Sequence, residues 1–360
     1  MFHASIQIQR FFNMFKTMLT VFLLASSPAW AASTPQLVYD NTFADMTYPS
    51  VAGDYLVYAQ RVGANHQIMR VKLDNMYGSA QDASARFTHE VLRNGVALAD
   101  GSFAYSDNRL GHITPWLSNN QQQSSIHTGT FTAALLPNHL DVAADGSTWV
   151  VDTTLESPRT QRLIKQHNNV KLDHELMGQQ WRIYHERLWQ KKSGYPDTKT
   201  GTSNAFAQPN IFIFKPESSA LTMLGDGFNA SLTADGKSMV FVRENNGNYD
   251  LWWQNIDGTN LKRLTKNTYA DLEPDVSPDG KRVVFVSNRD SRGDVLQTFI
   301  HVLDIQSGEI TTVTSGLGVT DGGPAWLDNN TIIFHSNRDP QAPNNHTVDN
   351  WRLWKVALPK

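Results

Sequence analysis

A short turn signal recurs along the chain at nearly constant spacing, and this period constrains the fold more than any other feature. Gly101 and Gly146 lie 45 residues apart, and Gly236 and Gly280 lie 44 apart. Turns of the Asp-Gly type need a positive φ angle, so each one predicts a hairpin. A repeat of this length is typical of one four-stranded propeller blade. The turns are Gly53-Asp54, Asp100-Gly101, Asp145-Gly146, Asp235-Gly236, Asp279-Gly280 and Asp328-Asn329.

The segments that follow the turns match one another and are apolar on both faces. Such runs suit strands that lie between neighbouring sheets. A third strand follows in most repeats, and a fourth is expected at 261–265 and 309–314. The second strands are expected at 56–61, 103–109, 149–154, 239–244, 283–289 and 332–338, and the third strands at 66–74, 210–218, 249–258, 298–308 and 351–358.

The chain is therefore expected to be all-β, with the architecture of a six-bladed β-propeller. Its last repeat ends after a third strand, and residues 36–43 (QLVYDNTF) form a strand that has no blade of its own. We expect this N-terminal strand to complete the last blade and close the ring, which leaves no unpaired final edge. Gly146 and Gly236 are 90 residues apart, so seven blades stay possible.

Residues 156–208 interrupt the repeat. They predict an excursion, partly helical, between the second and third strands of blade three; the alternative is a seventh blade without its turn signature. Aromatic and basic residues gather there, and such residues dominate the hot spots of protein interfaces. They either contact a partner protein or fold back as local core. The candidates for partner contact are Trp181, Tyr184, Arg187, Trp189 and Tyr195.

Residues 1–31 have the pattern of a secretory signal peptide. Two basic residues precede the apolar run 18–25, and Ala29-Trp30-Ala31 is a small-x-small cleavage site. The run is far shorter than the ~20 residues that a spanning helix needs. Whether translation starts at Met1 or Met14, we expect cleavage after Ala31 and a periplasmic protein, residues 32–360, made of a single propeller domain without a transmembrane segment.

Charge and cysteine content exclude several classes of function. The chain has 31 Lys and Arg against 34 Asp and Glu, so no basic field attracts nucleic acid. It contains no cysteine, which excludes disulfides, thiolate metal sites and a catalytic thiol. An exported protein without disulfides depends on its core for stability, and a chain of this length buries enough apolar surface for that.

The segment VSPDGKRVVFVSNRD (276–290) resembles the TolB-type propeller repeat, and 229–244 and 323–339 are weaker copies. This resemblance implies a TolB-like six-bladed propeller over about 36–360. The same repeat builds the propellers of the prolyl oligopeptidase family. Those peptidases also carry a hydrolase domain with a G-x-S-x-G elbow. This sequence has no such motif, so serine-hydrolase chemistry does not follow from the resemblance and no catalytic residue is predicted.

The first strands of the blades should line the central channel. The residue about four positions before each turn aspartate is mostly polar, with Tyr48 and Gly322 as approximate equivalents in two blades. Carboxylates and a histidine there suit a ligand or a divalent cation, the only cofactor considered. The alternative is that these groups only hydrate the channel. The candidates for ligand binding at the channel mouth are Asn94, His139, Asn229, Asp271, Glu273 and Asp321.

Two further patterns favour structural roles. Arg289 and Arg338 end equivalent second strands, where each is expected to reach a turn carboxylate of a neighbouring blade, such as Asp279, and fix blade register. His335 shares its aligned position with Asp152. A His–Asp pair would suggest acid–base chemistry, but blades three and six lie on opposite sides of the axis. We therefore expect His335 to be a buried, hydrogen-bonded histidine.

The expected function is that of an exported periplasmic propeller that acts as a protein-binding, ligand-binding or scaffold module. Its partner would be an envelope protein, a peptide or a glycan. One alternative is a metal-dependent oligosaccharide lyase or hydrolase of propeller fold, although the 12 histidines form no ligand-spaced pair. Another is a stand-alone propeller subunit of a peptidase system.

Overall fold

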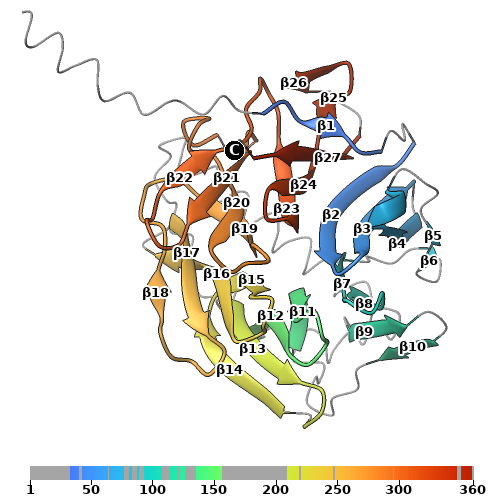
Figure 1. Ribbon diagram of the computed structural model, residues 1–360. Helices are drawn as coiled ribbons and strands as arrows, with labels where there is room; N and C mark the ends of the chain where they lie inside the picture. The colour runs from blue at the N-terminus through green and yellow to red at the C-terminus, as the bar shows by residue number, and fades with distance from the viewer. Residues whose placement is uncertain are drawn as a thin grey trace, which may run out of the picture. The chain divides into compact units, whose positions relative to one another are not determined.

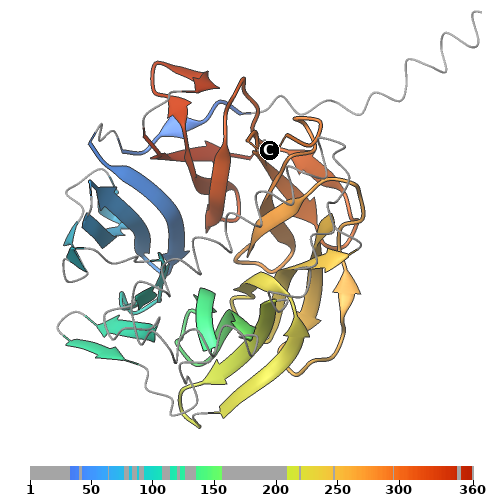
Figure 2. The same cartoon turned by 180° about the vertical axis from the view of Figure 1, so that it is seen from behind.

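Six antiparallel sheets of four or five strands follow one another along the chain and form the blades of a propeller (Figures 1 and 2). Residues Ser33–Leu358 make up one compact unit. The prediction of an all-β propeller is confirmed, with six blades rather than seven. The computed structural model describes residues 33–39, 43–63, 65–76, 81–82, 87–88, 93–107, 114–119, 122–125, 135–155, 209–218, 220–245, 248–294, 296–346 and 350–358.

Each blade begins with a first strand beside the axis and continues outward in sequence order. Every first strand contacts the first strand of the next blade, and β23 contacts β2, which closes the ring. The first strands are β2 (Asp45–Ala52), β7 (Arg93–Ala97), β11 (Leu135–Val142), β15 (Phe228–Leu232), β19 (Asp271–Val276) and β23 (Asp321–Asp328). The second strands are β3 (Tyr55–Val62), β8 (Phe103–Asp107), β12 (Trp149–Leu155), β16 (Ser238–Asn245), β20 (Arg282–Ser287) and β24 (Thr331–Ser336).

The outer half of each blade is shorter and less regular. A hairpin of β25 (Arg338–Asp339) and β26 (Ala342–His346) lies between β24 and β27, and a 3-10 turn, η1 (Leu73–Asn75), follows β4. The third strands are β4 (Asn65–Lys72), β9 (Thr114–Asn119), β13 (Pro209–Lys215), β17 (Asn248–Asn255), β21 (Phe299–Asp304) and β27 (Arg352–Ala357). The outermost strands are β5 (Gln81–Asp82), β6 (Phe87–Thr88), β10 (Gln122–Ser125), β14 (Ala220–Asp226), β18 (Lys262–Arg263), β22 (Ile310–Thr312) and β1 (Gln36–Leu37).

The N-terminal strand completes the last blade, as predicted. Gln36 pairs with Lys355 and Leu37 with Trp354, and the Val38 N–H donates to the Leu353 carbonyl at 2.8 Å. The paired stretch is Gln36–Leu37, shorter than the expected 36–43. Figure 1 shows β1, at the start of the chain, beside β27 at its end.

Blade three contains the predicted interruption. Its second strand, β12, ends at Leu155, and its third strand, β13, begins at Pro209 and pairs with β12. The chain therefore leaves and re-enters the same blade between these two strands. The expected helical content of residues 156–208 falls outside the described residues.

The turn residues explain the period of the sequence. Gly101, Gly146, Gly236 and Gly280 have φ angles of 83°, 75°, 63° and 69°. The aspartate before each glycine accepts the backbone N–H two residues ahead, as Asp145 does from Ser147 at 2.9 Å. An Asx hydrogen bond followed by a left-handed glycine is the local chemistry of a tight turn.

Apolar side chains fill the space between neighbouring blades, one cluster at each of the six junctions. Successive residues of one strand serve opposite junctions because side chains alternate along a strand. Phe334 packs toward blade five, and Ile333 packs toward blade one. This explains why the second strands are apolar on both faces.

Candidate functional site

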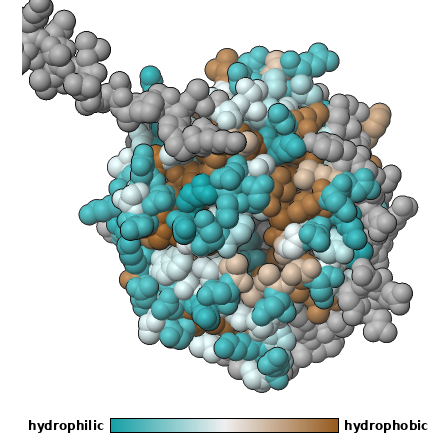
Figure 3. Space-filling view, in the orientation of Figure 1, coloured by the Kyte–Doolittle hydropathy of each residue, from teal (hydrophilic) through white to brown (hydrophobic). Residues whose placement is uncertain are grey.

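A β-bulge interrupts every first strand at an equivalent position. At the bulge Tyr48, Asn229 and Glu273 take left-handed φ angles of 51°, 48° and 50°, and Gly323 takes 48°. Non-glycine residues rarely adopt this conformation, and its repetition around one ring points to a feature of the channel wall. The surface in Figure 3 is hollowed near its centre, where the ring surrounds the axis.

The residue two positions after the bulge links one blade to the next. Ser50 Oγ accepts the Ala97 N–H at 3.1 Å, and Asp141 Oδ2 accepts the Leu232 N–H at 2.7 Å. The same contact recurs further around the ring. Ser231 Oγ accepts from Val276 at 3.4 Å, and Asp275 Oδ2 accepts from Trp326 at 3.0 Å. Sequence analysis did not identify these linking residues. A polar residue that recurs at one position of otherwise apolar strands was the signal that could have found them.

Two of these linking carboxylates have strongly perturbed acidity. Burial raises the pKa of Asp141 to about 7, partly offset by the Leu232 N–H and reinforced by the charge of Asp275. Burial also raises the pKa of Asp275 to about 6, against the hydrogen bonds from Trp326 and Ser231. Each carboxylate therefore titrates well above the range of an ordinary aspartate.

Glu273 and His335 converge over two glycines of β23. Glu273 Oε2 accepts the Gly323 N–H at 2.7 Å, and His335 Nδ1 accepts the Tyr48 N–H at 3.2 Å. A Cβ placed on Gly322 would stand 2.6 Å from His335 Nε2 and 3.3 Å from Glu273 Oε2. Side chains of blades five, six and one thus pack directly against these two glycines, which leave no room for a Cβ.

Burial shifts the pKa values of both His335 and Glu273. It lowers the pKa of His335 to about 3, so the imidazole is neutral at physiological pH. It also raises the pKa of Glu273, against the hydrogen bond from Gly323. The expectation of a buried, hydrogen-bonded His335 agrees with its 6% exposure and its Tyr48 contact.

The opposite part of the ring uses Asp152 in a similar way. Its carboxylate accepts the His139 N–H at 3.1 Å and the Asn229 N–H at 2.6 Å. Burial lowers the pKa of His139 to about 4. Asp152 and His335 therefore serve equivalent, separate junctions by accepting a backbone N–H of the next blade's bulge. Asn94 lies in β7 at the bulge of blade two.

Asp271 and Asp321 were expected beside Glu273 at the channel mouth, but the structure places them in buried ion pairs. Asp271 Oδ1 lies 2.6 Å from Arg289 Nη2. Asp321 receives Arg338 in bidentate fashion, Nε at 2.9 Å and Nη2 at 2.5 Å, and neither side chain of that pair is exposed. These carboxylates are already neutralised, so they are not open ligands.

The expected pairing of these arginines with turn carboxylates such as Asp279 is also wrong. Each second strand starts at the turn and ends near its arginine, so the strand's length separates Arg289 from Asp279. A strand of six residues spans roughly 20 Å, beyond the reach of a side chain. The arginines instead clamp the opposite end of their own blade.

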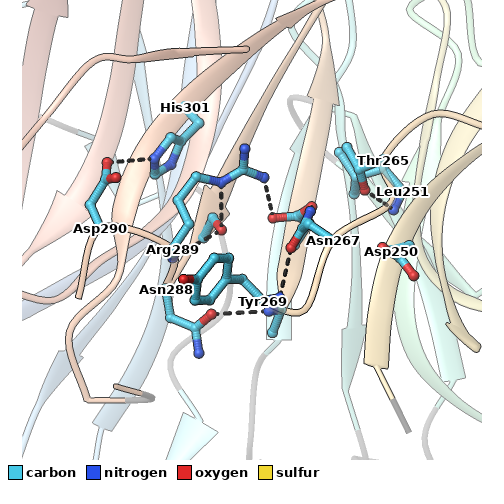
Figure 4. Close-up of polar contacts among 12 residues, drawn as sticks. Asp250, Leu251, Thr265, Asn267, Tyr269, Asn288, Arg289, Asp290 and His301 are labelled. Atoms are coloured by element: carbon cyan, nitrogen blue, oxygen red, sulfur yellow. Dashed lines mark hydrogen bonds and ion pairs between the residues drawn. The ribbon is translucent and has the colours of Figure 1, made fainter. Parts of the chain in front are cut away.

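A polar network anchors that end of blade five (Figure 4). Buried His301 faces the Phe299 carbonyl through Nδ1 and Asp290 Oδ2 through Nε2, each at 3.0 Å. Asn288 Oδ1 accepts the Ala270 N–H at 3.0 Å. These contacts tie the segments that flank the strands of blade five to those strands.

Exposed apolar side chains gather on one side of the ring. In an antiparallel blade, the links from second to third strands and from fourth to next first strands lie at the same end. We call this the connection face. It carries four of the six exposed large apolar residues among those described; these four are Phe43, Val62, Leu296 and Leu317, with exposures of 82%, 39%, 69% and 76%.

Two of these side chains belong to loops that are tied together. Thr320 Oγ1 donates to the Leu296 carbonyl at 2.5 Å, and Gln297 Oε1 accepts the Gly318 N–H at 3.3 Å. The Leu317 N–H donates to Asn344 of the β25–β26 hairpin at 2.8 Å. The apolar side chains therefore project from a supported surface.

Two further predictions concern partner contacts in the excursion and the absence of a transmembrane segment. Trp181, Tyr184, Arg187, Trp189 and Tyr195 lie outside the described residues. Within the described part of the chain, no helix is long and apolar enough to cross a membrane. The same part contains no group of three or more His, Cys, Asp or Glu side chains placed to hold a metal ion.

Comparison with known sequences gives a limited match. No model of a known protein family matches the chain. An uncharacterized protein of Agrobacterium fabrum is 29% identical over 109 residues, which are 28% of this chain and 37% of that relative. The aligned part thus spans little more than a third of the curated relative.

Solved structures match over nearly the whole length. A TolB candidate from Agrobacterium tumefaciens is 17% identical, with 88% of this chain and 91% of that chain covered and a TM-score of 0.50. An oligogalacturonate lyase in complex with manganese is 12% identical, with coverage of 92% and 97% and a TM-score of 0.52. At such identities the likeness shows the fold alone. The chain has the six-bladed propeller fold that TolB-like proteins share.

Proposed function

We propose that this protein is an exported binding scaffold that docks an envelope protein on its connection face. The observation that carries the proposal is the exposure of Phe43, Val62, Leu296 and Leu317, all in or next to links on that face. Exposed apolar side chains that cluster on one face are a common mark of protein interaction sites. The TolB-like fold supports the same reading by analogy.

The loops that carry two of these exposed side chains are held in place by hydrogen bonds. The loops of Leu296 and Leu317 are hydrogen-bonded to each other and to the β25–β26 hairpin. Preorganised loops lose little conformational freedom when they bind, which favours affinity. We therefore assign the docking contact to blades five, six and one.

The test is affinity capture from solubilised envelopes with a matched pair of variants. Leu296→Ser with Leu317→Ser changes the connection face, whereas Met223→Ser with Leu261→Ser changes similarly exposed residues elsewhere. We expect a partner that the wild type and the control pair both retain and the connection-face pair loses by at least about tenfold. Equal capture by all three proteins would contradict the proposal.

Export is the second part of the proposal. It rests on the basic residues, the apolar run and the Ala29-Trp30-Ala31 site of the leader. N-terminal sequencing of the protein from a periplasmic fraction should begin at Ala32. Recovery of the uncleaved chain from the cytoplasm alone would refute export without affecting the docking assay, which uses purified protein.

A further inference from the structure

We propose that the outer edge of β14 (Ala220–Asp226) binds an extended, uncharged peptide segment of a partner protein as an added strand. β14 is the last strand of the sheet of blade three, and among the described residues it pairs only with β13. Figure 1 draws it on the outer rim of the ring. In the part of the chain that the structure describes, its backbone groups on the side away from β13 therefore have no partner strand. Such a row of groups is a template for another strand.

The length of β14 distinguishes it from the outer strands of the other blades. It has seven residues, whereas the outermost strands elsewhere have two to four. A strand of seven residues is roughly 23 Å long, which is enough to pair with a peptide through several hydrogen bonds. Among the described strands, blade three therefore presents the longest outer edge of the ring.

The sequence of β14 lacks the residues that commonly keep an outer edge from pairing. It reads ALTMLGD and contains no proline, lysine or arginine, which are typical blocks on edge strands. The outer strand of blade four, in contrast, is Lys262–Arg263. A bulge interrupts the pairing near Gly225, and the pairs from Ala220 to Met223 are regular. The composition of β14 thus leaves this regular part open to a second strand.

The edge is accessible, and its position is fixed. Met223 is 54% exposed, and Thr222 beside it is also exposed. At the end of the strand Asp226 accepts from Arg243 of β16, with the Nε–Oδ2 and Nη2–Oδ1 distances at 2.7 and 2.6 Å. Leu224 packs against the core between blades three and four. A strand that is already ordered loses little conformational freedom when it binds.

The side chains of β14 define the peptide that fits. From Ala220 to Gly225 the strand carries no charge, so a charged peptide would lose hydration there without gaining an ion pair. Asp226, the charged residue of the strand, is already paired with Arg243. Met223 offers an apolar contact to a residue opposite it, and apolar or β-branched cross-strand pairs stabilise an antiparallel sheet. An uncharged segment rich in threonine, valine and isoleucine meets these conditions.

A second copy of this chain fits the edge less well than a peptide does. Two copies that meet only along β14 would share a strip about 23 Å by 10 Å on each copy, roughly 500 Å² in total. Stable interfaces between folded proteins bury about 1,000 Å² or more. The side chains of a peptide can also fold over Thr222 and Met223, which lie on opposite faces of the strand. We therefore assign the edge to a flexible segment of a partner.

The test is fluorescence anisotropy with the purified protein and a labelled peptide, Gly-Thr-Val-Thr-Ile-Thr-Gly. We expect a Kd on the order of 100 µM. The same peptide with N-methyl groups on its five central residues keeps its side chains but loses its backbone donors. It should bind at least about tenfold more weakly. Equal binding of the two peptides would overturn the inference.

Two proline variants locate the edge that binds. Neighbouring residues of a strand direct their N–H groups to opposite sides, so one of Leu221 and Thr222 faces β13 and the other faces outward. Proline at the outward position removes a free donor, whereas proline at the inward position breaks a hydrogen bond to β13. Of Leu221→Pro and Thr222→Pro, the variant with the higher melting temperature should therefore lose peptide binding by at least about tenfold. Leu261→Pro, at an exposed site beside β18, is the matched control and should bind as the wild type does.

Amide hydrogen exchange of the wild type tests the same edge without a substitution. In the free protein, one of the Leu221 and Thr222 N–H groups should exchange rapidly, and the peptide should slow its exchange at least about tenfold. Exchange that the peptide does not change would contradict the proposal, even if both proline variants fail to fold. Protection of both groups in the free protein would mean that another part of the chain fills the edge, and the inference would be wrong.

Two further measurements separate this edge from other interfaces. A dimer that the outward-facing proline dissociates in analytical ultracentrifugation would assign the edge to a second copy instead of a peptide. The Leu296→Ser, Leu317→Ser pair should bind the peptide as the wild type does, so the β14 edge and the connection face can fail separately. Loss of peptide binding in that pair would place the peptide on the connection face and not on β14.

Discussion

At the scale of single residues, two aspartates of blade three have pKa values that are shifted in opposite directions. Asp141 lies on a first strand, where burial raises its pKa to about 7. Asp145 lies in the following turn, where the hydrogen bonds from Ser147 lower its pKa. Only four residues separate them, so position relative to the turn decides the behaviour of each aspartate.

This contrast predicts a pH dependence of stability for Asp141→Asn. The pKa of Asp141 is about 7 in the folded protein, against an ordinary aspartate pKa of 3.8. The free energy of unfolding of the wild type therefore falls as pH rises between these two values. The variant has no carboxyl group at this position and does not lose stability in this way. Its stability relative to wild type should improve by on the order of 2 kcal/mol between about pH 4.5 and 8, as measured by urea unfolding.

Asp145→Asn is the matched control, and it should show the opposite sign. A lowered pKa stabilises the folded state above the ordinary pKa and loses that effect as pH falls. The variant should therefore compare worst with wild type near neutral pH. Parallel pH profiles for the two variants would contradict the assignment.

At the scale of elements, blades five and six are each fastened at both ends by different chemistry. Asx turns close one end, and arginine–carboxylate pairs clamp the other. The Arg338–Asp321 pair is fully buried, whereas the corresponding pair in blade one, Arg61–Asp45, has its arginine 56% exposed. Solvent decides how much such a pair contributes.

Arg338→Ala should therefore destabilise the protein far more than Arg61→Ala. The first leaves the Asp321 charge buried without its partner, which costs about 3–5 kcal/mol. The second removes a screened pair and costs less than about 1 kcal/mol. Guanidinium unfolding at neutral pH measures both, and equal losses would show that the Arg338 clamp does not hold the blade.

Local sequence signals predicted the blades but did not predict the bulges in their first strands. Turn residues and two-faced apolar runs are local signals, so the blades and their order followed from them. Glu273 and Asn229 lie on first strands, as the aligned repeats predicted. Asp271, two residues before Glu273, is paired with Arg289, and the bulge after Leu272 breaks the regular alternation of side chains in this strand. The sequence contains no local sign of where such a bulge falls.

The pairing of distant side chains was equally inaccessible. His335 and Glu273 meet only because blades five and six bring their strands together over Gly322. The aligned repeats marked each residue separately but gave no distance between them. Contacts across blades depend on ring geometry, which a single sequence does not encode at any one position.

At the scale of the whole molecule, one short strand completes the last blade and adds to the closure of the ring. Val38 is 5% exposed within the cluster between blades six and one, and β1 pairs with β27. Replacing residues 36–43 by a Gly-Ser segment should lower the melting temperature by about 5–10 °C, because it opens this edge and removes apolar burial. Phe43→Ser alone, at an 82% exposed site, should leave melting unchanged.

Calorimetry distinguishes the possible outcomes of that replacement. A single transition at lower temperature indicates that the six blades still unfold together. An unchanged melting profile would mean that the closure of blade six through β1 does not stabilise the ring.

The pairing of β1 with β27 also sets an order of events during synthesis. Gln36 emerges among the earliest described residues, yet its partner, Lys355, emerges among the last. Contacts of such large sequence separation form slowly. Five blades can assemble as the chain grows, while the opening strand must wait, unpaired, for the final one to arrive before the circle is complete.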